Sequence, residues 1–176
     1  MSEHARSPAT DPVTDPATDP VTGEALQDRY WPGNRCFGCG AENPDGLHLK
    51  SFVDEDAENG GEDLVATWVP HLRYQGPPGV VNGGVMAVPM DCHGTWTAMR
   101  AFATAAGEAE PLPAVTAGYS VRLIAPTPVE IPVHLRAEVC GVQGRKAKVR
   151  VTATSAGTLT ASFEGTFVRV QTPASA

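Results

Sequence analysis

The sequence lacks any run of about 18 or more apolar residues, the length at which a membrane-spanning helix becomes possible. It is also poor in basic side chains, with 13 lysine and arginine residues against 20 aspartate and glutamate residues. This balance argues against general nucleic-acid binding. The N-terminus has no basic segment that leads into an apolar one. We therefore expect no secretory signal, no membrane partner and a cytoplasmic location.

Cysteine is scarce, with four residues in the chain. Without a secretory signal, a disulfide framework is not expected. Cys92 and Cys140 lie in apolar stretches and are predicted to be buried small hydrophobic side chains. Cys36 and Cys39, in "CFGC", have the spacing of a zinc site. A structural zinc site needs four ligands, however, and no second pair follows, so we favour a packed turn and predict no metal.

The first 24 residues carry the repeat "ATDPVTDPATDPVTG". Such a segment cannot bury apolar surface, and each proline biases the residue before it toward extended geometry. Residues 1–24 are therefore predicted to be a disordered leader. Residues 25–172 are predicted to form a single domain, which agrees with the chain length of 176 residues.

Hydrophobic periodicity predicts an α+β domain. Apolar side chains recur every three to four residues over 83–106, which indicates one long helix. Period-two alternation indicates strands before and after it, and antiparallel sheets with one buried face show this pattern. For one of these strands the predicted buried face is Ala117, Tyr119, Val121 and Leu123. The expected strands lie within 47–53, 64–69, 116–126, 131–142, 145–157 and 158–170, and they would form a curved sheet of about six strands around the helix.

The stretch "GVVNGGVMAVPMDCHGTW" places one carboxylate, Asp91, in an otherwise apolar helix. A buried carboxylate is costly unless another group pairs with it. A Gly-Gly pair opens this helix, and an acid follows seven residues after the second glycine. With the strand order, "CFGCGAENPDGLHLKS" and "GYSVRLIAPTP", this pattern resembles the hotdog-fold acyl-CoA thioesterases, above all the phenylacetate-pathway type. The resemblance covers residues 36–170.

A helix N-terminus presents unpaired N–H groups and a partial positive charge. A thioester carbonyl needs such donors when its oxygen becomes an oxyanion. Gly83 and Gly84 have no side chains, so an acyl carbonyl can approach their amides. The resemblance assigns the oxyanion contact to Gly83. The alternative for the glycine pair is close backbone packing at a turn.

The resemblance makes Asp91 the catalytic carboxylate, either as nucleophile or as general base for water. Gly83 and Asp91 are eight residues apart, about 12 Å along a helix axis. One chain therefore cannot easily place both groups on the same carbonyl. In this family the helix start of one subunit faces the acid of the other, so a homodimer or a dimer of dimers is implied. The alternative is a structural carboxylate hydrogen-bonded to Thr95 or to a loop.

Two residues depart from the family pattern. Asn82 stands where a histidine often precedes the glycine pair. Asparagine can cap the helix, but it cannot act as an acid or base near neutral pH. Pro89 either kinks the helix and redirects Asp91, or marks a helix that begins only there. His93 is a further catalytic candidate across a dimer interface, although a packing role is favoured. Hotdog dehydratases use a histidine with an acid.

Coenzyme A carries phosphates, and the C-terminal part of the chain is its cationic part. Residues 122–169 hold 7 basic and 3 acidic side chains, whereas residues 25–121 hold 5 basic and 12 acidic side chains. A strip of cations on predicted strands could bind phosphate groups electrostatically. The candidates are Arg122, Lys146, Lys148 and Arg150, and the candidates for the acyl pocket are Tyr74, Gln75 and Trp96.

These observations predict an enzyme that hydrolyses an acyl-CoA thioester to a free acid and CoA. The catalytic candidates are Asp91, Gly83, Gly84, Asn82 and His93. Coenzyme A would enter as part of the substrate, and no separate cofactor is predicted. Two alternatives remain open: a non-catalytic protein that binds acyl-CoA or a small ligand, motivated by Asn82 and Pro89, and an enoyl-thioester hydratase or dehydratase that uses His93.

Overall fold

A computed structural model describes residues 23–55 and 63–171 of the chain. The predicted leader falls on residues 1–24 and therefore lies almost entirely outside the described residues. Within the described part, no helix is long and apolar enough to cross a membrane.

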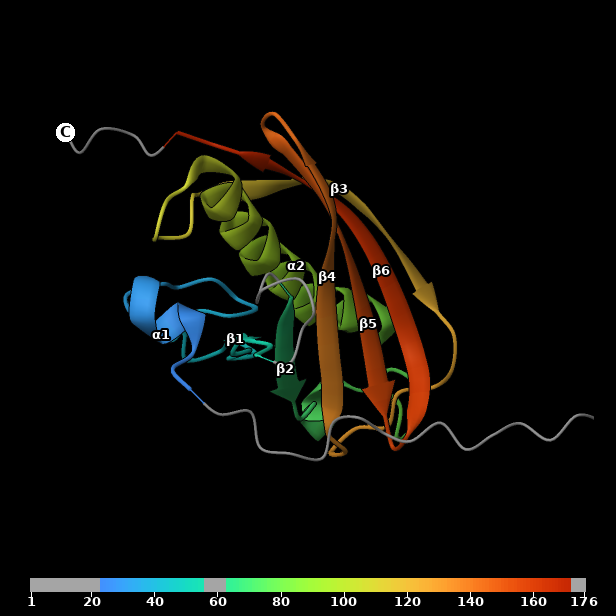
Figure 1. Cartoon of the computed structure of the whole chain (residues 1–176). Coiled ribbons are helices and arrows are strands. Elements are labelled where there is room, and N and C mark those ends of the chain that lie inside the picture. The colour runs from blue at the N-terminus through green and yellow to red at the C-terminus, as the bar shows by residue number, and fades with distance from the viewer. Residues whose placement is uncertain (1–22, 56–62, 172–176) are drawn as a thin grey trace, which may run out of the picture.

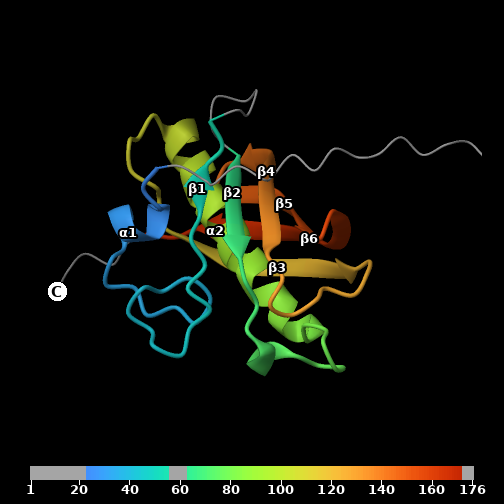
Figure 2. The ribbon, with the colours of Figure 1, turned by 90° about the horizontal axis from the view of Figure 1, so that it is seen from below.

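One long helix packs against one antiparallel sheet of six strands in the order β1-β2-β4-β5-β6-β3. The α+β prediction is confirmed. Helix α2 lies along the concave face of the curved sheet (Figure 1). The short helix α1 lies on the side of α2 that faces away from β5 and β6 (Figures 1 and 2). The elements are α1 Leu26–Tyr30, β1 Phe52–Val53, β2 Leu64–Trp68, the 3₁₀ turn η1 Leu72–Tyr74, α2 Gly83–Ala106, β3 Ala114–Leu123, β4 Val133–Gln143, β5 Lys146–Ser155 and β6 Thr158–Arg169.

The core lies between α2 and the inner face of the sheet. Phe163 and Phe167 on β6 are fully buried, as the alternation along this strand predicts. They pack where α2 carries Gly94: a Cβ atom there would lie 2.8 Å from the Phe167 ring. The glycine therefore allows the helix to approach the two rings closely. This packing fixes the height of α2 above the sheet, and with it the position of Asp91 one turn earlier.

Helix α2 is continuous from Gly83 to Ala106 and contains Pro89 in its interior. The alternative in which the regular helix begins only at Pro89 is therefore wrong. Proline has no N–H to donate to the Val85 carbonyl, but the rest of the turn is retained. The positive end of the helix dipole consequently lies at Gly83.

The first predicted strand, 47–53, is largely wrong, because only Phe52 and Val53 form β1. Leu47 and Leu49 are buried as their alternation suggests. Their amides, however, donate to the carbonyls of Phe37 and Gly38 rather than to a sheet neighbour, at 2.8 and 3.0 Å. Alternation reports which side chains are buried: both leucines belong to the hydrophobic core, while their backbone pairs with the loop that contains "CFGC".

Strand β3 forms one edge of the sheet, and the prediction of its buried face is wrong: Ala117 is exposed and only Val121 is half-buried. Tyr119 and Leu123 are 53% and 58% exposed, although both were predicted to face the core. The register between β3 and β6 shifts between Thr116 and Gly118. The edge position leaves the second half of β3 with one neighbouring strand and a row of apolar side chains on the surface. An uncovered edge of this kind is a ready surface for pairing with another chain.

Candidate active site

The start of α2 presents backbone donors that its own cap satisfies only in part. The Asn82 side chain accepts hydrogen bonds from the amides of Gly84 and Val85 at 2.9 and 3.4 Å. The capping role considered for Asn82 is thereby confirmed. No described residue accepts a hydrogen bond from the Gly83 amide. Gly83 therefore has an available donor at the positive end of a 24-residue helix.

Local hydrogen bonds hold the chain that leads into this helix. The Asn82 amide donates to the Tyr74 carbonyl, and the Val81 amide donates to the Thr127 carbonyl, each at 2.8 Å. The Gln75 side chain accepts from the Gly79 amide at 3.2 Å. Tyr74 and Gln75 were predicted to line the acyl pocket; they help to fix the entry to α2 and do not line the cavity beside Gly83. Gln75 is exposed and Tyr74 is half-buried against Trp68.

A cavity of about 430 Å³ opens beside Gly83. Its walls are mostly apolar. A Cβ atom on Gly83 would lie 2.5 Å from the end of the Leu123 side chain, so only glycine leaves the present space at the helix start. The lining residues are Pro77, Val80, Val81, Gly83, Met86, Leu123, Ile124, Ala125, Pro126 and Thr127. An acyl chain that entered this cavity would bring its carbonyl near the helix start.

Asp91 is half-buried on α2 and has one side-chain partner. The Thr116 hydroxyl on β3 donates to its Oδ1 at 2.8 Å. The Thr95 hydroxyl donates to the Asp91 backbone carbonyl at 2.9 Å and not to the carboxylate, so the alternative in which Thr95 binds the carboxylate does not hold. Burial raises the pKa of Asp91 above its usual value, and the Thr116 hydrogen bond opposes this shift. A single hydroxyl leaves three of the roughly four lone-pair sites of a carboxylate for a water molecule or a substrate.

Gly83 and Asp91 do not form one site within the chain. Eight helical residues separate them, about 12 Å of rise, and Asp91 does not line the cavity beside Gly83. Both lie on the part of α2 that the sheet does not cover completely. Half-buried residues recur there at helical spacing, at Val85, Val88 and Asp91. These residues form a half-buried stripe along α2, where Val85 and Val88 also pack against the core.

His93 lies in a closed hydrogen-bonded network in the core. Its ring is fully buried, with Nδ1 2.9 Å from the Ser51 hydroxyl and Nε2 3.0 Å from the Leu64 carbonyl. Burial lowers the pKa of His93 to about 4. Both ring nitrogens are therefore occupied in a neutral imidazole, with Nε2–H donating to the carbonyl and Nδ1 accepting from the hydroxyl. Ser51 is held in turn by Gln27, whose Nε2 donates to its hydroxyl at 3.1 Å. This arrangement ties α1, β2 and α2 together.

The predicted cationic residues lie on the solvent-facing side of the sheet. Lys148 and Arg150 line a second hollow of about 470 Å³ over β3, β5 and β6. Arg150 is 3.6 Å from the Glu164 carboxylate, which offsets part of its charge. Arg122 is exposed and precedes Leu123 of the helix-start cavity, whereas Lys146 lies at the exposed start of β5. The four cations therefore do not converge on one point.

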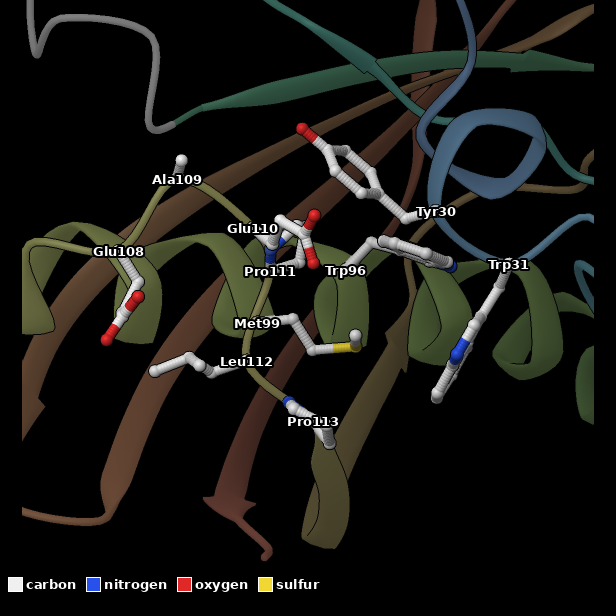
Figure 3. Close-up of a pocket in the computed structure, with 10 residues that line it drawn as sticks. All are labelled: Tyr30, Trp31, Trp96, Met99, Glu108, Ala109, Glu110, Pro111, Leu112 and Pro113. Carbon is white, nitrogen blue, oxygen red and sulfur yellow. The ribbon is translucent and has the colours of Figure 1, made fainter. Parts of the chain in front are cut away.

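Trp96 lines a third cavity, of about 420 Å³, shown in Figure 3. Its ring meets that of Trp31 edge to face, with centroids 5.9 Å apart. Tyr30 and the segment 108–113 complete the walls, with two glutamates, Glu108 and Glu110, at the rim (Figure 3). Trp96 was predicted to line the acyl pocket. In the structure it lines this cavity and not the one beside Gly83.

The Asn82 cap leads to a testable expectation. We expect Asn82→Ala to lower the free energy of unfolding by about 1 kcal/mol, because the amides of Gly84 and Val85 lose their acceptor. Asn82→Asp should retain most of the stability, since a carboxylate accepts the same bonds. Urea denaturation of the three proteins measures this difference. An equal loss of stability in both variants would show that Asn82 does not stabilise the helix by accepting these two hydrogen bonds.

Two features of the site escaped sequence reasoning. Thr116, the partner of Asp91, lies 25 residues away on β3, and nothing in its local pattern marks it. Cys92 was predicted to be only a small apolar group, and it is buried, but its thiol also lies 3.7 Å from the Cys36 thiol. The sequence alone shows only that Cys92 directly follows Asp91. The contact with Cys36 requires the tertiary fold.

A long helix held against a six-stranded curved antiparallel sheet defines the hotdog fold, and solved structures share it. A thioesterase superfamily protein from Shewanella loihica PV-4 is 28% identical with a TM-score of 0.61, over 82% of this chain and 99% of that one. The PaaI protein of the E. coli phenylacetic acid degradation operon is 14% identical with a TM-score of 0.55, over 62% of this chain and 74% of that one. A Streptococcus mutans UA159 protein bound to acetyl CoA is 14% identical with a TM-score of 0.54, over 62% of this chain and 82% of that one.

No family model and no curated protein matches the sequence. The structural comparisons nevertheless confirm both the hotdog fold and the resemblance to hotdog proteins of the thioesterase superfamily. The match to the Shewanella loihica protein spans nearly all of that chain. The resemblance therefore concerns the whole domain and not a fragment of it.

Proposed function

We propose that this protein hydrolyses an acyl-CoA thioester. The observation that carries the proposal is the pair of chemical groups on α2: the available Gly83 amide beside an apolar cavity, and the half-buried Asp91 carboxylate eight residues later. An amide donor at a helix start stabilises developing negative charge on a carbonyl oxygen. A carboxylate with free lone pairs activates water or attacks the carbonyl itself.

The reaction requires two subunits, because one chain holds the two groups too far apart. In the proposed homodimer, Gly83 of one subunit and Asp91 of the other meet at one thioester. The exposed edge of β3, with Tyr119 and Leu123 on its surface, and the half-buried stripe of α2 supply the contact surface. A two-fold axis makes such a contact self-complementary and creates two equal sites.

In the proposed reaction, the acyl chain occupies the cavity beside Gly83 and its carbonyl oxygen accepts the Gly83 hydrogen bond. If Asp91 acts as general base, it takes a proton from water while the water oxygen bonds to the carbonyl carbon. The tetrahedral intermediate then expels the CoA thiolate and yields the acid. If Asp91 acts as nucleophile, its oxygen bonds to the carbonyl carbon, the thiolate leaves, and water cleaves the resulting anhydride. Both routes need the same two groups.

Coenzyme A is proposed as the carrier for two reasons. A hotdog protein of similar fold is bound to acetyl CoA. The outer face of this sheet also carries the exposed cations Arg122 and Lys148, which suit phosphate groups. The apolar walls of the cavity favour an apolar acyl group, of aromatic or medium-chain type. A cytoplasmic location completes the proposal, because CoA thioesters form and react there.

The test is the release of CoA from acetyl, medium-chain, long-chain and aromatic acyl-CoAs, followed with a thiol reagent. The exposed thiols of Cys36 and Cys140 react with the same reagent, so the protein without substrate is the blank. We expect turnover with at least one acyl class, and a preference for apolar groups over acetyl. No release from any of the four donors would overturn the proposal.

Asn82 favours a second function, that of an acyl-CoA binding protein without turnover. The residue before Gly83 is asparagine, which does not titrate near neutral pH, so it gives the Gly83 amide no adjacent acid or base. Binding of a non-hydrolysable acyl-CoA analogue, measured by calorimetry, separates the two functions. Tight binding together with the absence of CoA release would establish the binding function.

A further inference from the structure

Three thiols from two distant parts of the chain meet beside α2. The sulfur atoms of Cys36, Cys39 and Cys92 all lie within 4.8 Å of one another. Cys36 and Cys39 come from the loop after α1, and Cys92 comes from α2, where it follows Asp91 directly. We call these residues the thiol cluster. The fourth cysteine, Cys140, does not belong to the cluster: it was predicted to be buried, but it is exposed on β4.

The loop that carries the first two thiols is built to bring them to the helix. The Cys36 amide donates to the Asn34 side chain at 2.8 Å, and the Gly40 amide donates to the Cys36 carbonyl at 2.9 Å. A Cβ atom on Gly40 would lie 2.5 Å from the Cys36 nitrogen. At Gly38 a Cβ atom would lie 2.3 Å from the Cys92 sulfur. Each glycine therefore leaves the space that the turn, or the approach of the third sulfur, requires.

The thiols also lie within hydrogen-bonding range of one another. The Cys36 and Cys92 sulfurs are 3.7 Å apart, and either thiol can be the donor. Cys39 and Cys92 are buried, so their thiols have few other polar groups to face. Metals bind the thiolate form of cysteine, so metal binding would release the thiol protons.

The separation of the sulfur atoms fits a metal better than a disulfide. Zinc binds thiolate sulfur at about 2.3 Å, so two sulfurs on a tetrahedral zinc are about 3.8 Å apart. The Cys36 and Cys92 sulfurs are 3.7 Å apart. A disulfide would bring two sulfurs to about 2 Å and leave the third thiol without a role. The remaining pairs lie within 4.8 Å, so small side-chain movements bring the three sulfurs to the spacing of one face of the zinc tetrahedron.

We infer that the thiol cluster binds one zinc ion, or another thiophilic divalent metal, through Cys36, Cys39 and Cys92. The described residues supply no fourth histidine, cysteine or carboxylate to the group. The fourth position therefore belongs to water or a small ligand, on the side where Cys36 reaches the surface. Bound metal would fasten the loop after α1 to α2 next to Asp91. This inference is independent of thioester hydrolysis.

The experiment is zinc titration of the untagged full chain, stripped with a chelator and kept reduced, in competition with a chromogenic zinc indicator. We expect one zinc ion per chain. Cys36→Ser and Cys39→Ser should each weaken zinc binding by more than about 100-fold, the upper range seen when even an outer-shell partner is lost. Cys140→Ser is the matched control and should bind zinc as the unmodified chain does. Cobalt substitution should give the intense visible bands of tetrahedral thiolate coordination, and these bands should be lost in the cluster variants.

Circular dichroism identifies any variant that fails to fold. The exposed Cys36 makes Cys36→Ser the decisive variant, because this change leaves the buried sulfur atoms in place. The inference is overturned if the reduced chain binds no zinc. It is also overturned if Cys36→Ser binds zinc as tightly as Cys140→Ser does, or if cobalt gives no thiolate bands. Because the experiment measures metal binding and not CoA release, the inference is tested independently of the proposed thioester hydrolysis.

Discussion

Asp91→Asn is expected to lower kcat for CoA release by about 10²- to 10⁴-fold, the usual contribution of a positioned base. Asparagine has nearly the shape of aspartate, and its side-chain oxygen can still accept the hydrogen bond that the Thr116 hydroxyl donates. The fold and the contact with β3 should therefore survive. The amide, however, neither takes a proton from water nor attacks a thioester. Steady-state CoA release under substrate saturation measures the loss.

The control is Asp45→Asn, which makes the same chemical change at an exposed position in the loop after α1. This variant should keep the activity of the unmodified chain. Urea denaturation of both variants checks their stability. If Asp91→Asn is folded and retains full activity, the carboxylate has no chemical role, and the family assignment of Asp91 is wrong even though the fold is right.

Gly83→Pro is expected to lower kcat by about 10²- to 10³-fold, the loss that follows removal of one oxyanion donor. Gly83 is the first residue of α2, and proline is favoured at this position because its missing N–H would have no partner in the helix. Asn82 has φ −60° and ψ 129°, which a following proline allows. The substitution thus removes the amide hydrogen without breaking the helix.

Gly83→Ala separates the amide from the shape of the site. Alanine adds a Cβ atom that presses on the Leu123 side chain just as proline does, but it keeps the N–H. We expect a modest loss of activity for alanine and a much larger loss for proline. Equal activities of the two variants would show that space beside Leu123, and not the Gly83 hydrogen bond, controls the reaction.

The sequence predicted the parts of this fold that depend on local pattern. The apolar periodicity located α2 at the bounds it has, and Asn82 was recognised as a possible cap. Phe163 and Phe167 follow the period-two alternation within the predicted strand 158–170, and they are fully buried. These predictions succeed because burial against one face imposes a fixed period on a helix or a strand.

Other features depend on neighbours that are distant in the chain. Tyr119 alternates like a core residue but lies 53% exposed, since β3 is an edge strand and strand order is not a local property. Leu47 alternates in the same way, yet its backbone pairs with the "CFGC" loop. The meeting of Cys92 with that loop could not be predicted either, because Cys92 lies 53 positions after Cys39, and β1, β2 and η1 come between them.

The central claim is that each site combines Gly83 of one subunit with Asp91 of the other. It is tested most directly with a mixed dimer of one Gly83→Pro chain and one Asp91→Asn chain, isolated through two different affinity tags. In this dimer one site carries both substitutions and the other carries neither. The mixed dimer is expected to regain about half of the unmodified activity, although each variant alone is nearly inactive. A mixed dimer as inactive as its parents would contradict the shared site and place both groups within one chain.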